Sequence, residues 1–517
     1  MRRIFCLLLL IYSVFLFAMC SDKNNPDVTK GIDQEPDSIP STEQVKKAFE
    51  INEKLGRGIN MGNAFEAPSE NEWGNPWKPE YFGIMAELGF SHVRVPVRWE
   101  TRTSNTLPYT IDETFLKRIK TVVDEALKNK LYVIINMHHH DALIADPVGQ
   151  KARFLAQWKQ ISDYFKDYSN LLLFEILNEP NGEITTNIWN QLLSEALEVI
   201  REENPSRIVL VGTAEYGGIS GLNQLKVPEE DGNIIVTVHY YNPFQFTHQG
   251  ADWAGDGDGK WLGTKWNDTD IEREAIHQDF QLVKDFSQKY NVPIHVGEFG
   301  AYNKADIKSR ERWTTYLARW LEDQGFSWAY WEFSAGFGIY DPNKKELIDP
   351  LVNALLHNSI PEPGAIKRTP AYTSDFSTGN NGWKLQQGGG TGSLERKNGE
   401  LSIDIKDGGN NSWNLQLIKE GITLKKGKEY EMVFTISSSD DRSFSSYIGM
   451  NSEPWSAYSG YKSFSTGENK QKVSHVFKMN ENDVNSARIV FDLGGKEPCK
   501  FILSNFTLNE IEVIPNE

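Results

Sequence analysis

Two glutamates stand at the ends of apolar segments that are far apart in the chain. Glu179 ends the run Leu171–Glu179, and Glu298 is the penultimate residue of the run Pro293–Phe299. A buried carboxylate needs a partner, so core packing alone explains neither residue. Hydrolysis of a glycosidic bond requires two carboxyl groups across a cleft: one protonates the departing oxygen, and the other attacks the sugar carbon or activates water. The alternative for either glutamate alone is a salt-bridged rim residue.

The runs that carry these glutamates belong to a series between residues 45 and 360. Short apolar runs, typical of strands buried on both faces, alternate with helical segments in which apolar residues recur every three or four positions. The predicted strands are Gly58–Asn63, His92–Val97, Leu131–His138, Leu171–Glu179, Arg207–Thr213, Ile234–Tyr241, Pro293–Phe299 and Ser327–Phe333. This α/β pattern predicts a (β/α)8 TIM barrel, with the weakest crossover near residues 217–225. The alternative is an open doubly wound sheet, which more often has a glycine-rich turn after its first strand.

The carboxyl ends of the predicted strands carry an unusual set of side chains. In a closed barrel of this kind the active site lies at those ends. The residues there are Asn63, Arg94, His138, His139, Asn178, Glu179, His239, Tyr240, Tyr241, Glu298 and Trp331. Because charged groups gather on one rim, the sequence predicts a functional site at that rim.

Several of these strand ends resemble the signatures of glycoside hydrolase family 5, the cellulase family. The segments are Phe174–Pro180, Ile294–Gly300, His92–Val97, Asn136–His139, His239–Pro243 and Trp328–Phe333. The opening segment Gly58–Glu66 is similar to that of thermophilic bacterial endoglucanases of the family that also cleave mannan. The resemblance covers residues 45–357 and implies double displacement, with Glu179 as general acid and base and Glu298 as nucleophile. Retaining enzymes hold these two carboxyl groups about 5–5.5 Å apart.

The same resemblance implies roles for the neighbouring residues. A cation and a hydrogen bond both favour an ionised carboxyl, so Arg94 and the Tyr241 hydroxyl are expected to keep Glu298 charged. Asn178 is expected to bind the sugar 2-hydroxyl, and His138 and His239 to position the substrate and the acid. The expected sugar-binding residues are Trp331 at the cleavage point, Asn63, Glu66 and His139 on the non-reducing side, and Trp253 near the cleft.

Neither a cofactor nor a metal ion is predicted. Three consecutive histidines, His138 to His140, point to alternating faces of a strand and cannot easily ligate one ion. The segment 255–259, Gly-Asp-Gly-Asp-Gly, is similar to a calcium loop but lacks the distal glutamate of that motif. We therefore expect residues 255–259 to form a solvated loop over the cleft.

The sequence pattern changes after residue 360. Residues 361–372 are rich in proline and predict a linker, and residues 373–517 alternate apolar with polar positions, as in an antiparallel β-sandwich. This region resembles jelly-roll carbohydrate-binding modules attached to cellulases. The candidate sugar-stacking residues are Trp413, Tyr447 and Trp455, with core packing as the alternative for each.

The amino terminus predicts export. Residues 1–20 read as a signal peptide that ends at Cys20, which resembles the lipidated cysteine of bacterial lipoproteins, and residues 21–44 read as a flexible tether. We therefore expect an outer-membrane or cell-surface lipoprotein, with a secreted or periplasmic enzyme as the alternative. Lipid at Cys20 would be its one membrane attachment, and we expect a monomer. The net charge of −17 argues against nucleic acid as a partner.

The expected activity is therefore that of an endo-β-1,4-glucanase acting on a β-glycan polysaccharide. An endo-β-1,4-mannanase or xyloglucanase with the same mechanism is the alternative, because a few loop contacts can decide between them. A non-catalytic surface glycan-binding protein is the hypothesis of another class, and the presence of both glutamates argues against it.

Overall fold

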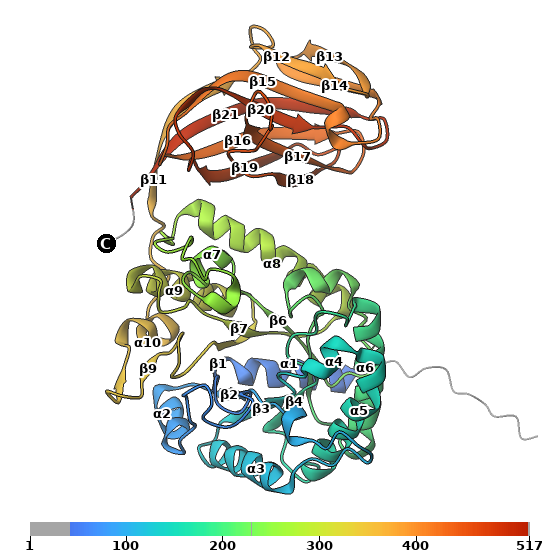
Figure 1. Ribbon diagram of the computed structural model, residues 1–517, viewed down its shortest axis with the longest axis vertical. Helices are drawn as coiled ribbons and strands as arrows, with labels where there is room; N and C mark the ends of the chain where they lie inside the picture. The colour runs from blue at the N-terminus through green and yellow to red at the C-terminus, as the bar shows by residue number, and fades with distance from the viewer. Residues whose placement is uncertain (1–41, 229, 515–517) are drawn as a thin grey trace, which may run out of the picture.

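The amino-terminal part of the chain is a closed barrel of eight parallel strands. The computed structural model describes residues 42–228 and 230–514. Each strand pairs with the next, and β8 pairs with β1, which closes the barrel (Figure 1). The strands are β1 Arg57–Asn60, β2 His92–Val95, β3 Tyr132–Asn136, β4 Leu172–Glu175, β5 Val209–Val211, β6 Ile234–His239, β7 Ile294–Phe299 and β8 Ser327–Tyr330. The predicted TIM barrel is confirmed, and the doubly wound alternative is wrong.

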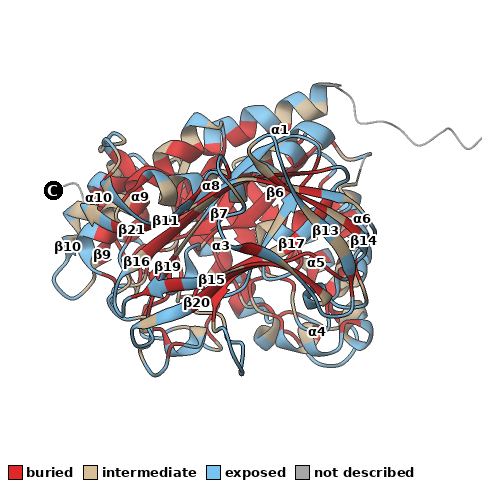
Figure 2. Cartoon of the chain, turned by 90° about the horizontal axis from the view of Figure 1, so that it is seen from above, coloured by how far each residue is buried: buried red, intermediate tan, exposed pale blue. Residues whose placement is uncertain are grey.

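Helices surround the barrel, with one face buried against the strands and the other exposed (Figure 2). They are α2 Glu80–Leu88, α3 Glu113–Lys128, α4 Asp141–Ala145, α5 Pro147–Tyr164, α6 Thr186–Glu203, α7 Phe244–Thr247, α8 Asp270–Tyr290, α9 Ile307–Asp323 and α10 Asp349–Leu356. Side chains cap several of them: Asp112 accepts from the third residue of α3, and Thr269 and Glu272 form a capping box on α8. The crossover after β5, weakest in the sequence, contains a short 3-10 helix, η2 Ile219–Gln224, in place of an α-helix.

Helix α1, Thr42–Leu55, closes the amino-terminal end of the barrel. Its residues Ala48, Ile51 and Leu55 pack on inward-facing residues of β3 to β6. The helix starts at Thr42, so the prediction that residues 21–44 form a flexible tether is wrong for residues 42–44.

The predicted signal peptide, Cys20 and the rest of the tether lie outside the described residues. Within the described residues, no helix is long and apolar enough to cross a membrane.

The carboxyl-terminal part is a sandwich of two antiparallel sheets, as predicted. One sheet has the order β13-β14-β21-β16-β19, with β11 also paired to β21, and the other has the order β12-β15-β20-β17-β18. The strands are β11 Ala365–Ser374, β12 Trp383–Gln387, β13 Thr391–Lys397, β14 Glu400–Asp407, β15 Leu415–Leu424, β16 Glu429–Ser438, β17 Arg442–Gly449, β18 Lys462–Thr466, β19 Gln471–Lys478, β20 Val484–Asp492 and β21 Lys500–Ile514. Apolar side chains from both sheets form a separate core.

The connection between the two parts is shorter than the sequence predicted. Strand β11 begins at Ala365 and pairs with β21, so most of the predicted linker, 361–372, belongs to the sandwich. The two prolines that mark the start of that linker precede the strand, whereas Pro370 lies beside a register shift that accommodates it. The connecting backbone is also held on the barrel, because the N–H of Gly364 donates to the carbonyl oxygen of Asp268 at 2.7 Å.

Candidate active site

A cleft of about 1400 Å³ lies at the carboxyl ends of the barrel strands. It brings together residues as far apart in the sequence as Asn63 and Phe337. Twelve of the predicted site residues line it: Asn63, Glu66, His138, His139, Asn178, Glu179, His239, Tyr240, Tyr241, Trp253, Glu298 and Trp331. Arg94 does not line the cleft, because its side chain is fully buried beneath it.

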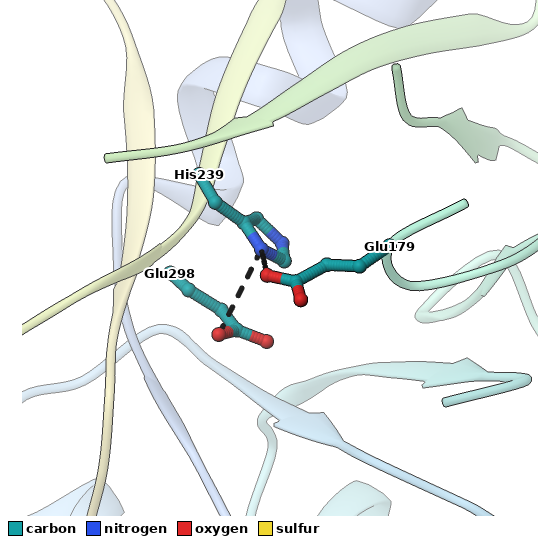
Figure 3. A group of neighbouring side chains, drawn as sticks. All are labelled: Glu179, His239 and Glu298. Carbon is teal, nitrogen blue, oxygen red and sulfur yellow. Dashed lines mark hydrogen bonds and ion pairs between the residues drawn. The ribbon is translucent and has the colours of Figure 1, made fainter. Parts of the chain in front are cut away.

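Glu179 and Glu298 point toward one another across this cleft, with the ring of His239 beside both (Figure 3). The Nδ1 atom of His239 lies 2.7 Å from Oε1 of Glu179 and 3.7 Å from Oε2 of Glu298. One oxygen of each carboxyl group and this nitrogen all lie within 4.8 Å of one another. The two carboxyl groups thus approach as closely as in retaining glycosidases, and more closely than the roughly 6.5–9.5 Å of inverting ones.

The exposure of the two glutamates differs. The side chain of Glu179 is 30% exposed, whereas that of Glu298 is 6% exposed. A group that exchanges protons with water needs access to solvent, and a carboxylate that attacks carbon benefits from a dry site. The asymmetry suits Glu179 to proton transfer and Glu298 to attack.

A β-bulge at Gly297 directs Glu298 into the cleft. Val238 pairs with Val296, but the next residue, His239, pairs with Glu298, so Gly297 is the additional residue. Side chains alternate along a regular strand, and an extra residue resets that alternation. The bulge therefore allows both His295 and Glu298 to face the interior of the barrel.

Arg94 lies beneath the cleft and bonds to four side chains. Its Nη1 donates to Oε1 of Glu298 at 2.8 Å and to Oδ1 of Asn60 at 2.9 Å. Its Nε and Nη2 donate to the two oxygens of Glu175 at 2.6 and 2.7 Å, and Nη2 also donates to Oδ1 of Asn178 at 2.6 Å. Bidentate contacts of this kind fix a guanidinium rigidly. Because Oδ1 of Asn178 faces Arg94, its Nδ2 is the group presented to a molecule in the cleft.

The sequence analysis missed Glu175, although a signal was present. Glu175 is a charged residue within the buried run Leu172–Glu175, and its side chain is fully buried. A charge in such a position requires a partner of opposite sign. The partner is Arg94 on β2, two strands away from β4 around the barrel.

Burial and neighbouring charges shift the titration of the central groups. Burial raises the pKa of Glu298, and the nearby charges of His239 and Arg94 and the hydrogen bond from Tyr241 at 2.9 Å oppose it without outweighing it. The expected contacts of Arg94 and Tyr241 are present, and both act to lower the pKa of Glu298, although burial leaves it above its ordinary value. Burial alone would lower the pKa of His239, but Glu298 and Glu179 outweigh that effect and raise it.

His138 and Trp331 form one wall of the cleft. Their rings are stacked, with centroids 5.6 Å apart and planes 8° apart. The Nδ2 of Asn136 donates to Nδ1 of His138 at 3.1 Å, and burial lowers the pKa of His138 well below its usual value. His138 is therefore neutral with its proton on Nε2, a donor for a ligand. His139 meets the ring of Trp73 edge to face, and Trp73 is a cleft residue that the sequence analysis missed.

Glu66 and Glu332 brace the cleft floor. Glu66 is 1% exposed and accepts hydrogen bonds from the backbone N–H groups of Asn63 and Ala64. Burial raises its pKa to about 8. Glu332, which the sequence analysis missed, accepts from the N–H groups of three residues in the following loop, and burial raises its pKa to about 7. Both carboxyl groups are engaged by backbone, so their main effect is to hold the loops after β1 and β8.

Two further predicted elements have clear structural roles. Trp253 is 63% exposed and packs edge-on against Tyr302 at the outer end of the cleft. In the segment 255–259, the carboxylate of Asp256 accepts from the N–H groups of Gly250 and Trp261, so it braces its own loop.

Among the described residues, Glu179, His239 and Glu298 are close enough to one another to hold a metal ion. Arg94, which donates to Glu298, adds a positive charge that disfavours a second cation there.

The candidate stacking residues of the sandwich are not equivalent. Trp413 and Trp455 are 60% and 42% exposed, whereas Tyr447 is buried, with the ring of Tyr461 against it at 4.7 Å. The guanidinium of Arg488 lies 4.5 Å from the centre of the Trp455 ring. Trp413 and Trp455 can therefore offer a ring face to a ligand, and Tyr447 supports the sheet beneath.

Comparison with known proteins assigns both parts of the chain. Residues 55–336 match the family described as cellulase (glycosyl hydrolase family 5), and residues 371–500 match a carbohydrate binding domain. Among solved structures, endoglucanase Cel5A from Thermotoga maritima is 51% identical, with a TM-score of 0.58, over 60% of this chain and 99% of that one.

Two curated relatives match a little over half of this chain. Endoglucanase H of Acetivibrio thermocellus is 37% identical over 60% of this chain and 33% of its own length. Endoglucanase B of Clostridium cellulovorans is 29% identical over 59% of this chain and 72% of its own. The chain spans about a third of the length of the first of these relatives. With the barrel, the paired glutamates and the family match in agreement, this chain belongs to glycosyl hydrolase family 5.

Proposed function

We propose that this protein is a retaining endo-β-1,4-glycan hydrolase that cleaves β-1,4-glucan and glucomannan. The observation that carries the proposal is the close pair of carboxyl groups, Glu179 and Glu298, on opposite sides of an open cleft. A cleft of about 1400 Å³ is large enough to hold a stretch of a polymer chain, which is what an endo-acting enzyme needs.

In the first step, the Glu298 carboxylate attacks the anomeric carbon and forms a glycosyl ester. The bond from that carbon to the glycosidic oxygen breaks, and the departing oxygen takes the proton of Glu179. His239, 2.7 Å from Glu179, orients the acid, and Nδ2 of Asn178 donates to the sugar beside the reacting carbon.

In the second step, water replaces the departed sugar. The Glu179 carboxylate removes a proton from this water as its oxygen attacks the anomeric carbon, and Glu298 leaves as a carboxylate. Arg94 and Tyr241, which donate to the two oxygens of Glu298, stabilise the carboxylate that is regenerated. Two inversions at one carbon give net retention.

Similar solved structures support the choice of substrate. Thermotoga maritima Cel5A, 50–51% identical to this chain, has been solved in complex with cellobiose and with mannotriose. A glucan-cleaving enzyme that also accepts mannose units fits both. The second candidate is an enzyme dedicated to mannan or to xyloglucan. Initial rates on glucan, glucomannan, mannan and xyloglucan distinguish a glucanase, a mannanase and a xyloglucanase.

Two measurements test the mechanism. Proton NMR of the first product formed from a cellooligosaccharide should show the β-anomer, because retention preserves the configuration. A 2-deoxy-2-fluoro cellobioside with an activated leaving group should label Glu298, as peptide mass mapping would detect. The α-anomer appearing first, or a label on another residue, contradicts the proposal.

The sandwich is proposed to hold the same polysaccharide. Its support is the exposed pair of indole rings, Trp413 and Trp455, with Arg488 beside one of them, in a region that matches a carbohydrate binding domain. Aromatic faces stack on apolar sugar faces. A second binding site on one chain raises the local concentration of substrate at the first.

Export with a lipid anchor at Cys20 completes the proposal, as the sequence of residues 1–20 supports. Labelled palmitate should enter the wild-type protein in a bacterial host, and Cys20→Ala should abolish that labelling. Labelling that survives the substitution excludes Cys20 as the anchor.

A further inference from the structure

Four polar side chains face the interior of the barrel immediately beneath the cleft. They are His92 on β2, Thr237 and His239 on β6, and His295 on β7. Each is at least nine-tenths buried, and the Nε2 atoms of the three histidines and Oγ1 of Thr237 have no hydrogen-bond partner within the described part of the chain. Buried polar atoms are nearly always hydrogen-bonded, to protein or to ordered water. Four such atoms in one place therefore indicate a common partner.

These groups adjoin one another. Thr237 and His295 are paired positions on neighbouring strands, and the rings of His92 and His295 are 5.2 Å apart. The bulge residue Gly297 lies between Thr237 and His239: a Cβ atom added there would stand 2.7 Å from Oγ1 of Thr237 and 3.3 Å from Nε2 of His239. These contacts bring the four atoms to one region of the barrel interior, called the polar space below, and any side chain at position 297 would crowd it.

The proton positions on His92 and His295 follow from their other contacts. Nδ1 of His92 lies 2.8 Å from the carbonyl oxygen of Leu55, which can only accept, so this nitrogen carries the proton. Nδ1 of His295 lies 2.8 Å from Oγ of Ser327, whose own proton is donated to Oδ1 of Asn52. Nδ1 of His295 must therefore donate as well.

Both rings are neutral. Burial lowers the pKa of His92 to about 4 and that of His295 well below its usual value. In a neutral ring with its proton on Nδ1, Nε2 is an acceptor. The polar space is thus bordered by two acceptors, one hydroxyl group and Nε2 of His239.

We propose that an ordered water occupies this space, and that Thr237, His92 and His295 act through it as positioning residues that keep a proton on Nε2 of His239. The water donates its two hydrogens to Nε2 of His92 and Nε2 of His295. Its oxygen then accepts from the Thr237 hydroxyl and from His239. The four contacts are the full hydrogen-bonding capacity of one water.

The consequence for the cleft concerns the other nitrogen of His239. The charges of Glu298 and Glu179 raise the pKa of His239, and protonation of Glu179 removes the second of these charges. In the proposed state the proton is on Glu179 and the ring is neutral: with its own proton on Nε2, the ring presents an acceptor at Nδ1, and Glu179, 2.7 Å away, donates to it. This arrangement holds Glu179 in the state that the first step needs, so the role assigned to the water rests on the proposed function. The other charged or titratable groups that face His239 are Glu298, Arg94, His138 and His295.

The kinetic test compares Thr237→Val, which removes the hydroxyl at nearly constant shape, with Thr237→Ser, which keeps it. On phenyl cellobioside, a poor leaving group that needs the acid, Thr237→Val should lower kcat/KM by about tenfold. On dinitrophenyl cellobioside, which needs little protonation, the loss should be within about twofold. Thr237→Ser should stay within about twofold of wild type on both. Equal losses for the two variants, or for the two substrates, overturn the proposal.

A measurement on the wild-type protein keeps the proposal testable if Thr237→Val does not fold. A high-resolution crystal structure should show a water within about 3.2 Å of Oγ1 of Thr237 and of Nε2 of His295, and a dry space overturns the proposal. Nitrogen-15 NMR should place a proton on Nε2 of His239, assigned by comparison with His239→Asn. A wild-type protein inactive on every β-glycan would refute the proposed function and leave the water and tautomer results intact.

Discussion

The cleft of the barrel and the outer face of the sandwich use different physical means to meet a sugar. In the barrel, Glu298, Arg94 and Glu175 are buried and joined in one network: Arg94 bonds to both glutamates and also to Asn178 and Asn60. On the sandwich, Trp413 and Trp455 are exposed. Bond cleavage requires atoms placed to within a fraction of an ångström, whereas capture of a polymer requires only accessible area.

This difference predicts how each part responds to substitution. A single change in the buried network removes a reacting group or leaves a charge without its partner, so the effect should be large. A single change on the exposed face removes one of several weak contacts, so the effect should be small.

The largest effect is expected for Glu298→Gln. The amide has the same shape but cannot attack the anomeric carbon, so turnover of glucan should fall by roughly 10⁴-fold or more, while binding measured by calorimetry persists. Glu215→Gln is a matched control, because Glu215 lines the same cleft but its carboxylate bonds to the hydroxyl group of Ser220 rather than to the central network. Near-normal hydrolysis by Glu298→Gln would exclude it as the nucleophile.

Glu179→Ala should have the next largest effect, and one that depends on the substrate. Loss of the acid should slow hydrolysis of natural glycans by roughly 10²- to 10⁴-fold, and dinitrophenyl glycosides, which leave without protonation, should form the glycosyl ester almost normally. Steady-state and burst kinetics on both substrates measure this. Equal losses in the first step on good and poor leaving groups would remove Glu179 from the role of acid.

The pH dependence should reflect the burial of Glu298. Only its ionised form attacks, and burial raises its pKa above the ordinary 4.5, so activity is present above the raised pKa and is lost as the pH falls through it. The acid limb of kcat/KM on a soluble cellooligosaccharide should therefore lie above pH 4.5. An acid limb below that value would show that Arg94 and Tyr241 outweigh burial.

Trp455→Ala should have the smallest effect. Loss of one stacked ring should weaken binding to insoluble or polymeric glucan by about two- to tenfold, as pull-down or affinity electrophoresis would measure. Hydrolysis of a soluble aryl cellobioside, which uses the barrel alone, should not change. If that soluble activity also falls, the two parts are not independent in the way that their separate cores suggest.

The fold and much of the site could be predicted from the sequence because the signals are local. Each buried parallel strand is an apolar run, and the residues at its end or shortly after it reach the rim, so Glu179, His239 and Trp331 could be placed without coordinates. The strand β11 was predicted as linker because its exposed residues and Pro370 hide the alternation that marks other strands. Its pairing with β21 depends on a segment more than 130 residues later.

What the sequence determined by itself is therefore the set of chemical groups and the strand end that carries each, since these follow from residue type and from periods of two and 3.6 along the chain. Tertiary structure decided the rest. The bulge at Gly297, the sharing of Arg94 between Glu175 and Glu298, and the meeting of His92, His295 and Thr237 all depend on the register between strands. Register is a property of paired strands, and it is set by packing across the closed barrel rather than by either strand alone.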